Sequence, residues 1–308
     1  MNLAIIYGGS SSEREISLKT ATSIIKFISN KYNIYSLDIE SDYDKLALFL
    51  KENNIDLVFN ALHGGKGENG YFQSFLERNK IKFTGSNSIS SKIAMDKNKT
   101  KILCEKNLIP TPRWDYLDFN DLELNDINYN KIINKYKNSC VIKPADDGSS
   151  IGMTIIYDNL NQNKIHEGLS KCLKISKKII IEEYIKGREF TVCILDGAAL
   201  PIVEIIPKSE FYDFKSKYTS GECDYVIPAG ISSSAQMKMI EYSLAVNKII
   251  GCRHYSRVDL RMDESNIYIL EINTLPGMTD TSLFPKAAKA DNLSYNKLID
   301  KIIKLANR

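Results

Sequence analysis

The chain has 308 residues, of which 43% are hydrophobic and 26% are charged, and its formal net charge is only +3. This composition is typical of a soluble globular protein of two or three domains, and the small charge without a long basic run gives no indication of a nucleic-acid partner. No apolar run approaches the roughly 20 residues that span a bilayer, so no membrane partner is expected. The N-terminus lacks the features of a signal peptide, and the cysteines have no Cys-x-x-Cys spacing, which predicts reduced thiols in a cytoplasmic protein.

The N-terminal region is predicted to form a parallel sheet. Residues 3–7 are an apolar run that ends at two glycines, and a helix is predicted from about Glu13 after three serines that can cap it. Further strands are predicted at 33–37 and 56–60, separated by a helix at 43–51. Strands that alternate with helices imply right-handed crossovers in a parallel sheet. The two glycines lack the G-x-G-x-x-G spacing, so a Rossmann dehydrogenase is only a weak alternative.

Two polar residues of this region are candidates for function, and each also has an ordinary structural explanation. Glu13 lies at a helix start, where a carboxylate simply complements the helix dipole. His63 follows a predicted strand in a glycine-rich turn, at the edge where open α/β sheets bind ligands. A lone histidine is more often structural, so the residues alone leave both interpretations open.

Two lysines are prominent in the middle of the chain. Lys97 lies on a predicted helix after a Ser- and Asn-rich loop at 85–91, where a domain boundary is plausible, and by itself it reads as a solvated charge. Lys143 ends a predicted strand before a Gly/Ser loop at 148–152, which can offer N–H groups and hydroxyls to phosphate oxygens. This is not a Walker A loop, because the Gly-Lys-Ser/Thr order and the following helix are absent. A plain hairpin loop is the alternative.

The remaining elements are read from periodicity and composition. The predicted helices cover residues 160–175, 237–250 and 294–305, and the predicted strands cover residues 153–157, 179–185, 187–192 and 200–206. The polar segment 115–138 gives no prediction. A long polar loop runs from residue 211 to about residue 230, and long loops in compact domains are often lids.

Residues 257–273 predict a β-hairpin with polar side chains on one face. Two alternating segments flank a turn at 263–266. If the turn places Asp263 opposite Ile267, the pairs that face each other are Asp259 with Glu271 and Arg257 with Asn273. A slip of one residue would send one strand's side chains to the other face.

The oxygen atoms on this hairpin predict a metal site. Asp259, Glu271 and Asn273 supply two carboxylates and a carboxamide without His or Cys, which suits Mg²⁺. The ordinary alternative is a surface hairpin with a polar face. However, Asn is a poor strand residue, and it directly precedes a loop in which Gly277 allows backbone to approach a ligand closely. These observations favour the metal site.

The run Glu-Ile-Asn-Thr-Leu-Pro-Gly-Met-Thr at 271–279, followed by Ser282 and Leu283, resembles the metal and substrate segment of D-alanine–D-alanine ligases, which are members of the ATP-grasp superfamily. Further segments are similar to motifs of the same family, in the same order along the chain. They are residues 8–17, 61–70, 96–97, 143–152, 182–189 and 217–218. The resemblance therefore covers essentially the whole chain.

The resemblance implies an α/β (α+β) fold with three domains, in which an N-terminal Rossmann-like parallel sheet accompanies two ATP-grasp lobes that sandwich ATP. The implied domains are residues 1–90 for substrate, 91–185 for the central lobe, and 186–308 for the C-terminal lobe with the lid loop and metal site. The implied reaction is the ATP-dependent ligation of two D-alanines through an acyl phosphate, for peptidoglycan precursor synthesis. ATP, two Mg²⁺ or Mn²⁺ ions per site and a cytoplasmic homodimer are expected with it.

The resemblance also assigns roles to residues of this chain. The implied catalytic residues are Glu13, Ser149, Tyr218, Arg257 and Gly277. The implied substrate-binding residues are His63, Ser282 and Leu283. The implied nucleotide-binding residues are Lys97, Lys143, Ser150, Glu182, Glu183, Tyr184, Ile185, Glu189 and Lys217. The implied metal ligands are Asp259, Glu271 and Asn273.

Within these sets, Glu13 is expected to meet the ammonium of the first D-alanine, and Glu182 to accept from the exocyclic amine of adenine. A tyrosine at position 218 accords with relatives that form dipeptides rather than depsipeptides. Two alternatives remain open. One is an ATP-grasp ligase that joins D-alanine to D-lactate or D-serine, and the other is a catalytically silent nucleotide-binding protein.

Overall fold

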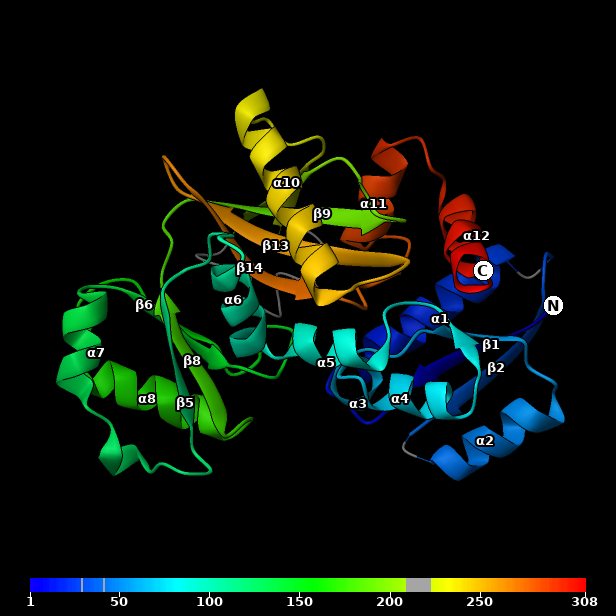
Figure 1. Cartoon of the computed structure of the whole chain (residues 1–308), viewed down its shortest axis with the longest axis horizontal. Coiled ribbons are helices and arrows are strands. Elements are labelled where there is room, and N and C mark those ends of the chain that lie inside the picture. The colour runs from blue at the N-terminus through cyan, green and yellow to red at the C-terminus, as the bar shows by residue number, and fades with distance from the viewer. Residues whose placement is uncertain (29, 41, 209–222) are drawn as a thin grey trace.

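The computed structural model describes residues 1–28, 30–40, 42–208 and 223–308, which form three sheets and their covering helices (Figure 1). The predicted mixed α/β fold class is confirmed. The strands of the three sheets fall within residues 1–90, 91–185 and 186–308 respectively. The domain boundaries themselves remain a prediction, because the C-terminal helix returns to pack on the first sheet.

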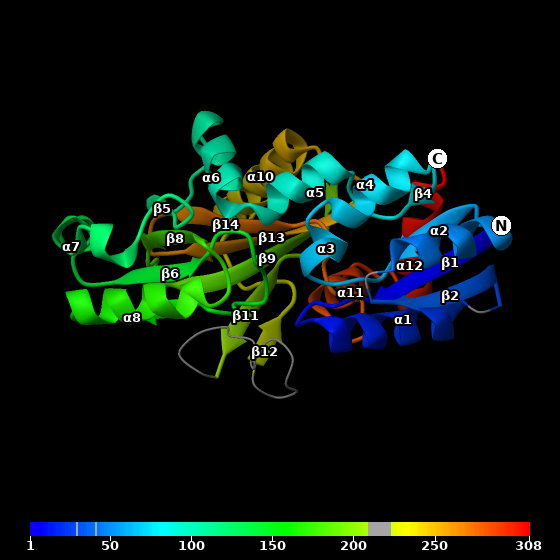
Figure 2. The same ribbon diagram turned by 90° about the horizontal axis from the view of Figure 1, so that it is seen from below.

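The first sheet is parallel and has the order β2 (Asn33–Ile39), β1 (Asn2–Gly8), β3 (Leu57–Asn60), β4 (Lys82–Phe83). Successive residues of β1 bury opposite faces, as the period of a strand requires. Leu3 and Ile5 pack with α1 (Arg14–Ile28) and α12 (Tyr295–Ala306), whereas Ala4 and Ile6 pack with α2 (Tyr43–Glu52) and α4 (Tyr71–Arg78). Helices therefore cover both faces, as Figure 2 shows for α1 on one side and α2 and α4 on the other.

The second sheet is antiparallel, with the order β5 (Trp114–Asp118), β8 (Lys178–Glu183), β6 (Cys140–Pro144), β7 (Thr154–Ile156). Its apolar face packs with α7 (Tyr129–Tyr136) and α8 (Gln162–Leu173). Both β5 and α7 lie in or beside the segment 115–138, which gave no prediction. The strand β5 is half-buried and polar because it forms an edge of the sheet, so it shows no clear apolar period.

The third sheet has the order β12 (Cys223–Val226), β11 (Val203–Pro207), β9 (Arg188–Leu195), β13 (Tyr255–Met262), β14 (Ile267–Asn273), and β10 (Ala198–Ala199) pairs with β9. The helix α10 (Ser233–Ile250) packs on one face, and α11 (Leu283–Ala290) packs on the other. The predicted loop from 211 to about 230 is partly wrong, because Cys223–Val226 forms the strand β12. The part from 211 to 222 lies outside the described residues.

The predicted hairpin is present, with one correction to its register. Asp259 pairs with Glu271 and Arg257 pairs with Asn273, as expected. Near the turn, however, Ile267 lies opposite Met262 and not opposite Asp263. A β-bulge at the step from Asp259 to Leu260 accounts for the one-residue difference, because it lets the pairing shift by one position along the hairpin.

The helix predicted to carry Lys97 is divided in two. Asp96 ends α5 (Ser88–Met95) and caps α6 (Lys97–Lys106), where its carboxylate accepts from the Lys99 backbone N–H. Lys97 is therefore the first residue of a helix. None of the helices in the described residues combines the length and the apolar character that a membrane span requires. All six cysteines lie in the described residues and none of them forms a disulfide.

Candidate active site

Two adjoining cavities lie among the three sheets, and together they are lined by every described residue that the sequence proposed for the site. The larger cavity, of about 530 Å³, is lined from this set by Glu13, His63, Ser149, Arg257, Asn273, Gly277, Ser282 and Leu283. The smaller cavity is lined from this set by Lys143, Ser150, Glu182, Glu183, Tyr184, Ile185, Glu189 and Asp259. Lys97 and Glu271 line both cavities. Lys217 and Tyr218 lie outside the described residues.

In the larger cavity, Glu13 connects the first sheet to the Gly/Ser loop of the second. The Ser149 hydroxyl donates to Glu13 Oε1, although the two residues come from different sheets. Glu13 is buried just before α1, and a Cβ at Gly64 would lie only 2.5 Å from its Oε2. Glycine is therefore needed at position 64 for the carboxylate to hold this place.

His63 is a buried histidine with partners on both sides of its ring. Its Nε2 lies 3.0 Å from the Thr20 hydroxyl, and the ring also makes a hydrogen bond with the backbone of Leu275. Burial lowers the pKa of His63, which the carboxylate of Glu13 only partly offsets. A neutral ring is therefore favoured at neutral pH. Its role toward substrate stays a prediction.

Arg257, which also lines the larger cavity, forms a two-point ion pair with Asp259. Its Nε and one terminal nitrogen lie 2.9 and 2.7 Å from the two carboxylate oxygens. The Thr191 hydroxyl also donates to this carboxylate at 2.7 Å. The fork of a guanidinium matches a carboxylate, so the pair fixes the direction of both side chains on β13.

The segment after β14 is held by its own polar groups. Asn273 Oδ1 accepts from the Leu275 backbone N–H at 2.7 Å, and the Ser282 hydroxyl accepts from the Thr279 backbone N–H at 3.1 Å. A Cβ at Gly277 would lie 3.0 Å from the Ser282 hydroxyl, which is closer than side chains normally approach. Gly277 therefore leaves its backbone accessible beside Ser282.

Lys97 and Glu271 form the junction between the cavities. The Lys97 ammonium donates to the Asp147 carbonyl at 2.6 Å and lies 3.2 Å from Glu271 Oε2. Gly148, which follows Asp147 in the Gly/Ser loop, also lines both cavities. In this loop, Ser149 and Ser150 have φ of 53° and 59°, in the left-handed region that residues with a side chain seldom adopt. Such strain is typical of functional loops.

The smaller cavity has a buried carboxylate between two lysines. Glu182 Oε1 lies 2.5 Å from the Lys143 ammonium, and Oε2 lies 2.8 Å from the Lys101 ammonium. Burial alone would raise the pKa of Glu182, but the two ammonium groups outweigh it and lower that pKa. Glu182 is therefore an ionised acceptor.

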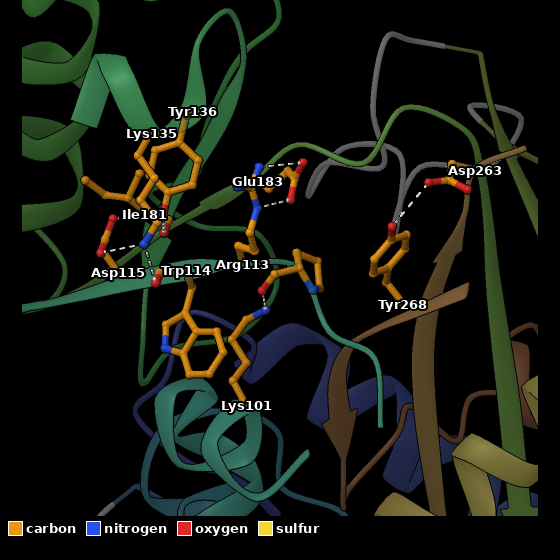
Figure 3. Close-up of polar contacts among 11 residues, drawn as sticks. Lys101, Arg113, Trp114, Asp115, Lys135, Tyr136, Ile181, Glu183, Asp263 and Tyr268 are labelled. Atoms are coloured by element: carbon orange, nitrogen blue, oxygen red, sulfur yellow. Dashed lines mark hydrogen bonds and ion pairs between the residues drawn. The ribbon is translucent and has the colours of Figure 1, made fainter. Parts of the chain in front are cut away.

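Two arginines contact the segment where β8 ends and β9 begins. The Glu183 carboxylate forms a two-point pair with Arg113 at 2.9 and 3.1 Å (Figure 3). Arg261 donates to the Ile185 carbonyl at 2.9 Å and lies 3.3 Å from Glu189 Oε2. Its guanidinium also lies 5.1 Å from the ring centre of Tyr184.

Comparison with known proteins decides the family. A sequence profile described as "D-ala D-ala ligase C-terminus" matches residues 103–304. A D-alanine–D-alanine ligase of Carboxydothermus hydrogenoformans is 38% identical over 311 residues, which cover 99% of this chain and 98% of the relative. The chain belongs to the D-alanine–D-alanine ligase family.

Solved structures of the family are similar over the same length. A D-alanine–D-alanine ligase from Bacillus anthracis superposes with a TM-score of 0.87 at 36% identity, covering 99% of this chain and 97% of that chain. The structure of the Bacillus anthracis enzyme complexed with ATP has a TM-score of 0.86 at 34% identity, with the same coverage. The VanG D-Ala:D-Ser ligase from Enterococcus faecalis has a TM-score of 0.82 at 28% identity and covers 99% of each chain.

The metal site expected of a ligase of this family fits the residues present by its donor chemistry. Asp259 and Glu271 occupy facing positions on neighbouring strands, and Asn273 follows on the same strand as Glu271. Among the described residues, no group of three His, Cys, Asp or Glu side chains has the geometry of a metal site. The set consists of two carboxylates and an amide, and each carboxylate has a basic neighbour, Arg257 or Lys97. Oxygen ligands of this kind suit Mg²⁺ or Mn²⁺.

Three charged residues in or beside the two cavities were not predicted from the sequence. Lys101 contacts Glu182, Arg261 lines the smaller cavity, and Glu68 lines the larger cavity, where burial raises its pKa. Two of them could have been found by spacing. Lys101 lies four residues after Lys97 on one helix face, and Arg261 lies two residues after Asp259 on one strand face.

Proposed function

We propose that this protein joins two D-alanine molecules to D-alanyl-D-alanine with ATP, releasing ADP and phosphate, for the synthesis of peptidoglycan precursors. The observation that carries the proposal is the junction of the two cavities, which Lys97, Gly148 and Glu271 line from both sides. A triphosphate in the smaller cavity and a carboxylate in the larger cavity would meet there. Similarity to D-alanine–D-alanine ligases over nearly the whole chain supports this substrate.

In the first step, a carboxylate oxygen of one D-alanine attacks the γ-phosphorus, and the bond to the bridging oxygen breaks as ADP leaves. Both reactants are anionic, so cationic groups have to reduce their repulsion. Lys97 and Lys143 are the described candidates, and Lys217 is a third candidate outside the described residues. Glu13 would bind the ammonium of this D-alanine and so direct its carboxylate toward the junction.

In the second step, the amine of the other D-alanine attacks the acyl phosphate carbon to give a tetrahedral intermediate. The C–O bond to phosphate then breaks, and the departing phosphate takes up the proton that the amine loses. The oxyanion that forms needs preorganised donors. Arg257 and the backbone N–H of Gly277 are our candidates, since both line the larger cavity. The Ser282 hydroxyl and the Leu283 N–H, at the start of α11, would hold the carboxylate of the attacking D-alanine.

Asp259, Glu271 and Asn273 are the residues that would hold Mg²⁺ or Mn²⁺, and we propose two ions per site. When bound, such ions neutralise phosphate charge and orient the triphosphate. We further propose a cytoplasmic homodimer, on the basis of the family resemblance. Sedimentation of the purified protein over a range of concentrations tests the dimer.

A related function would differ in the second amino acid, which accepts the first D-alanine. The structure is similar to a D-Ala:D-Ser ligase as well as to D-alanine–D-alanine ligases, so D-serine is the alternative acceptor that an observation favours. D-lactate is a third candidate acceptor. Phosphate release measured with D-alanine plus each acceptor, across pH, distinguishes them.

One assay tests the proposed function directly. The protein is incubated with ATP, Mg²⁺ and D-alanine, and the product mass and released phosphate are measured together. We expect the mass of the dipeptide and one phosphate for each dipeptide formed. Nucleotide binding without a ligated product would overturn the proposal and indicate a silent nucleotide-binding protein.

A further inference from the structure

Lys101 is an ammonium group with no access to solvent, since only 1% of the residue is exposed. It donates to the Thr111 hydroxyl at 2.8 Å and to the Pro112 carbonyl at 3.2 Å, and the Lys101 side chain is drawn in Figure 3. Its third contact is Glu182 Oε2, at 2.8 Å. The first two contacts are hydrogen bonds, and the contact with Glu182 is an ion pair. A buried charge of this kind needs a counter-charge, and its only ion pair among the described residues is with Glu182.

The two lysines that flank Glu182 differ in what else they can reach. Lys143 lines the smaller cavity together with Glu182, whereas Lys101 lies behind the carboxylate and does not line that cavity. In the proposed reaction, triphosphate oxygens compete with Glu182 for the Lys143 ammonium. Lys101 has no such competitor, so it remains the partner of Glu182 when nucleotide binds.

An ionised carboxylate can only accept hydrogen bonds. When such a carboxylate faces position 6 of a purine, it can accept a hydrogen bond from an amino group there. A carbonyl oxygen at that position is also an acceptor, so the two groups repel each other. A neutral carboxyl group could donate to that oxygen and would lose the distinction. The base preference of the smaller cavity therefore depends on what keeps Glu182 ionised and in place.

We propose that Lys101 is a positioning residue for base recognition, which holds Glu182 as a fixed acceptor and so makes the smaller cavity select 6-aminopurine over 6-oxopurine nucleotides. This inference rests on the proposed function for the placement of adenine at Glu182. Lys101 itself touches no nucleotide and acts through the carboxylate.

Calorimetric titration with Mg-ATP and with Mg-ITP, without any amino acid, tests the inference. Lys101→Met should reduce the preference for ATP over ITP by about tenfold or more, equivalent to at least about 1.4 kcal/mol. Lys101→Arg keeps the charge and should restore most of the preference. Lys106→Met is the matched control, because Lys106 is exposed near the end of the same helix, α6, and lines neither cavity. It should leave the preference within about twofold.

A second pair of variants keeps the test decisive if Lys101→Met does not fold. Glu182→Gln removes the charge that Lys101 compensates, so Lys101→Met combined with Glu182→Gln leaves no unpaired carboxylate in the interior. If Lys101 acts through Glu182, adding Lys101→Met to Glu182→Gln should not change the base preference further. A further loss in the double variant would overturn the inference.

A structural role for Lys101 gives a different result. In that case Lys101→Met would lower the affinities for ATP and for ITP by the same factor, and the positioning role would be overturned. Nucleotide binding does not require D-alanine, so the two proposals fail separately. A wild-type protein that binds ATP selectively but does not ligate D-alanine overturns the proposed function alone.

Discussion

The ammonium of Lys97 lies 3.2 Å from Glu271 Oε2, at the place where the two cavities adjoin. Lys97 begins α6 and Glu271 lies on β14, so the pair connects a helix to the third sheet. Its side chains are 8% and 27% exposed, which means that a ligand can reach the carboxylate more easily than the ammonium. Glu271 is therefore the residue whose charge the reaction should depend on most directly.

Glu271→Gln should abolish phosphate release that depends on D-alanine, because a carboxamide has no charge with which to hold a divalent cation. The measurement is phosphate release with saturating ATP, Mg²⁺ and D-alanine. Circular dichroism should show an unchanged fold, since the substitution preserves shape. Glu264→Gln is the control, because Glu264 is exposed in the turn of the same hairpin. Near-normal turnover by Glu271→Gln would remove this residue from the metal site.

Arg257→Met should lower kcat by about 100- to 1000-fold, the usual cost of losing one donor to a developing oxyanion. It also leaves Asp259 without its two-point partner. Arg257→Lys retains the charge but not the forked guanidinium. The activity of Arg257→Lys should therefore lie between that of Arg257→Met and that of the wild type. Steady-state dipeptide formation provides the measurement. A kcat within threefold of the wild type for Arg257→Met would contradict the role in oxyanion stabilisation.

The hairpin shows what the sequence predicts and where such prediction ends. Alternation with period two correctly predicted which side chains of the two strands share a face. It predicted the pairs of Asp259 with Glu271 and of Arg257 with Asn273, but the register at the turn was wrong by one residue. The alternation itself gives no sign of the bulge after Asp259. The extra residue there is Leu270 on β14, while the pairing of β13 with β9 continues without a shift.

Buried ion pairs are harder to predict than strand faces. Lys101 reads as an ordinary helix lysine, and its burial is seen only from its contacts with Glu182 on β8 and with the segment around Pro112. Arg261 likewise reads as the polar residue of an alternating strand. Its partners, Ile185 and Glu189, lie in another part of the chain and reach it only through the pairing of β13 with β9.

Arg261→Met should raise the KM for ATP by about tenfold, the equivalent of one charge-assisted hydrogen bond. The substitution removes the donor to the Ile185 carbonyl and the partner of Glu189, for which the family resemblance implies binding of the ribose hydroxyls. The loss should be smaller for 2′-deoxy-ATP, because that nucleotide makes less use of Glu189. Initial rates with both nucleotides measure the effect. An equal loss for both would mean that Arg261 does not act through Glu189.

Asp300 connects α12 to the segment between α1 and β2, and it does so through charge. It accepts from the Tyr32 hydroxyl and pairs with Lys31 at 2.6 Å and Lys304 at 3.0 Å. Burial opposes ionisation, but the hydrogen bonds from Lys31, Tyr32 and Lys304 lower the pKa of Asp300 to about 2. Because this pKa is lower than in an unfolded chain, the stabilisation is complete above about pH 4 and is lost as the pH falls toward 2.

Asp300→Asn should therefore lower the free energy of unfolding by on the order of 2 kcal/mol at neutral pH. The difference from the wild type should shrink as the pH falls from about 4 toward 2, where the native carboxyl also becomes neutral. Thermal unfolding at a series of pH values measures both effects. Asp291→Asn is the control, since Asp291 is exposed at the end of α11. A difference that stays constant over this pH range would show that the charge of Asp300 does not hold α12 in place.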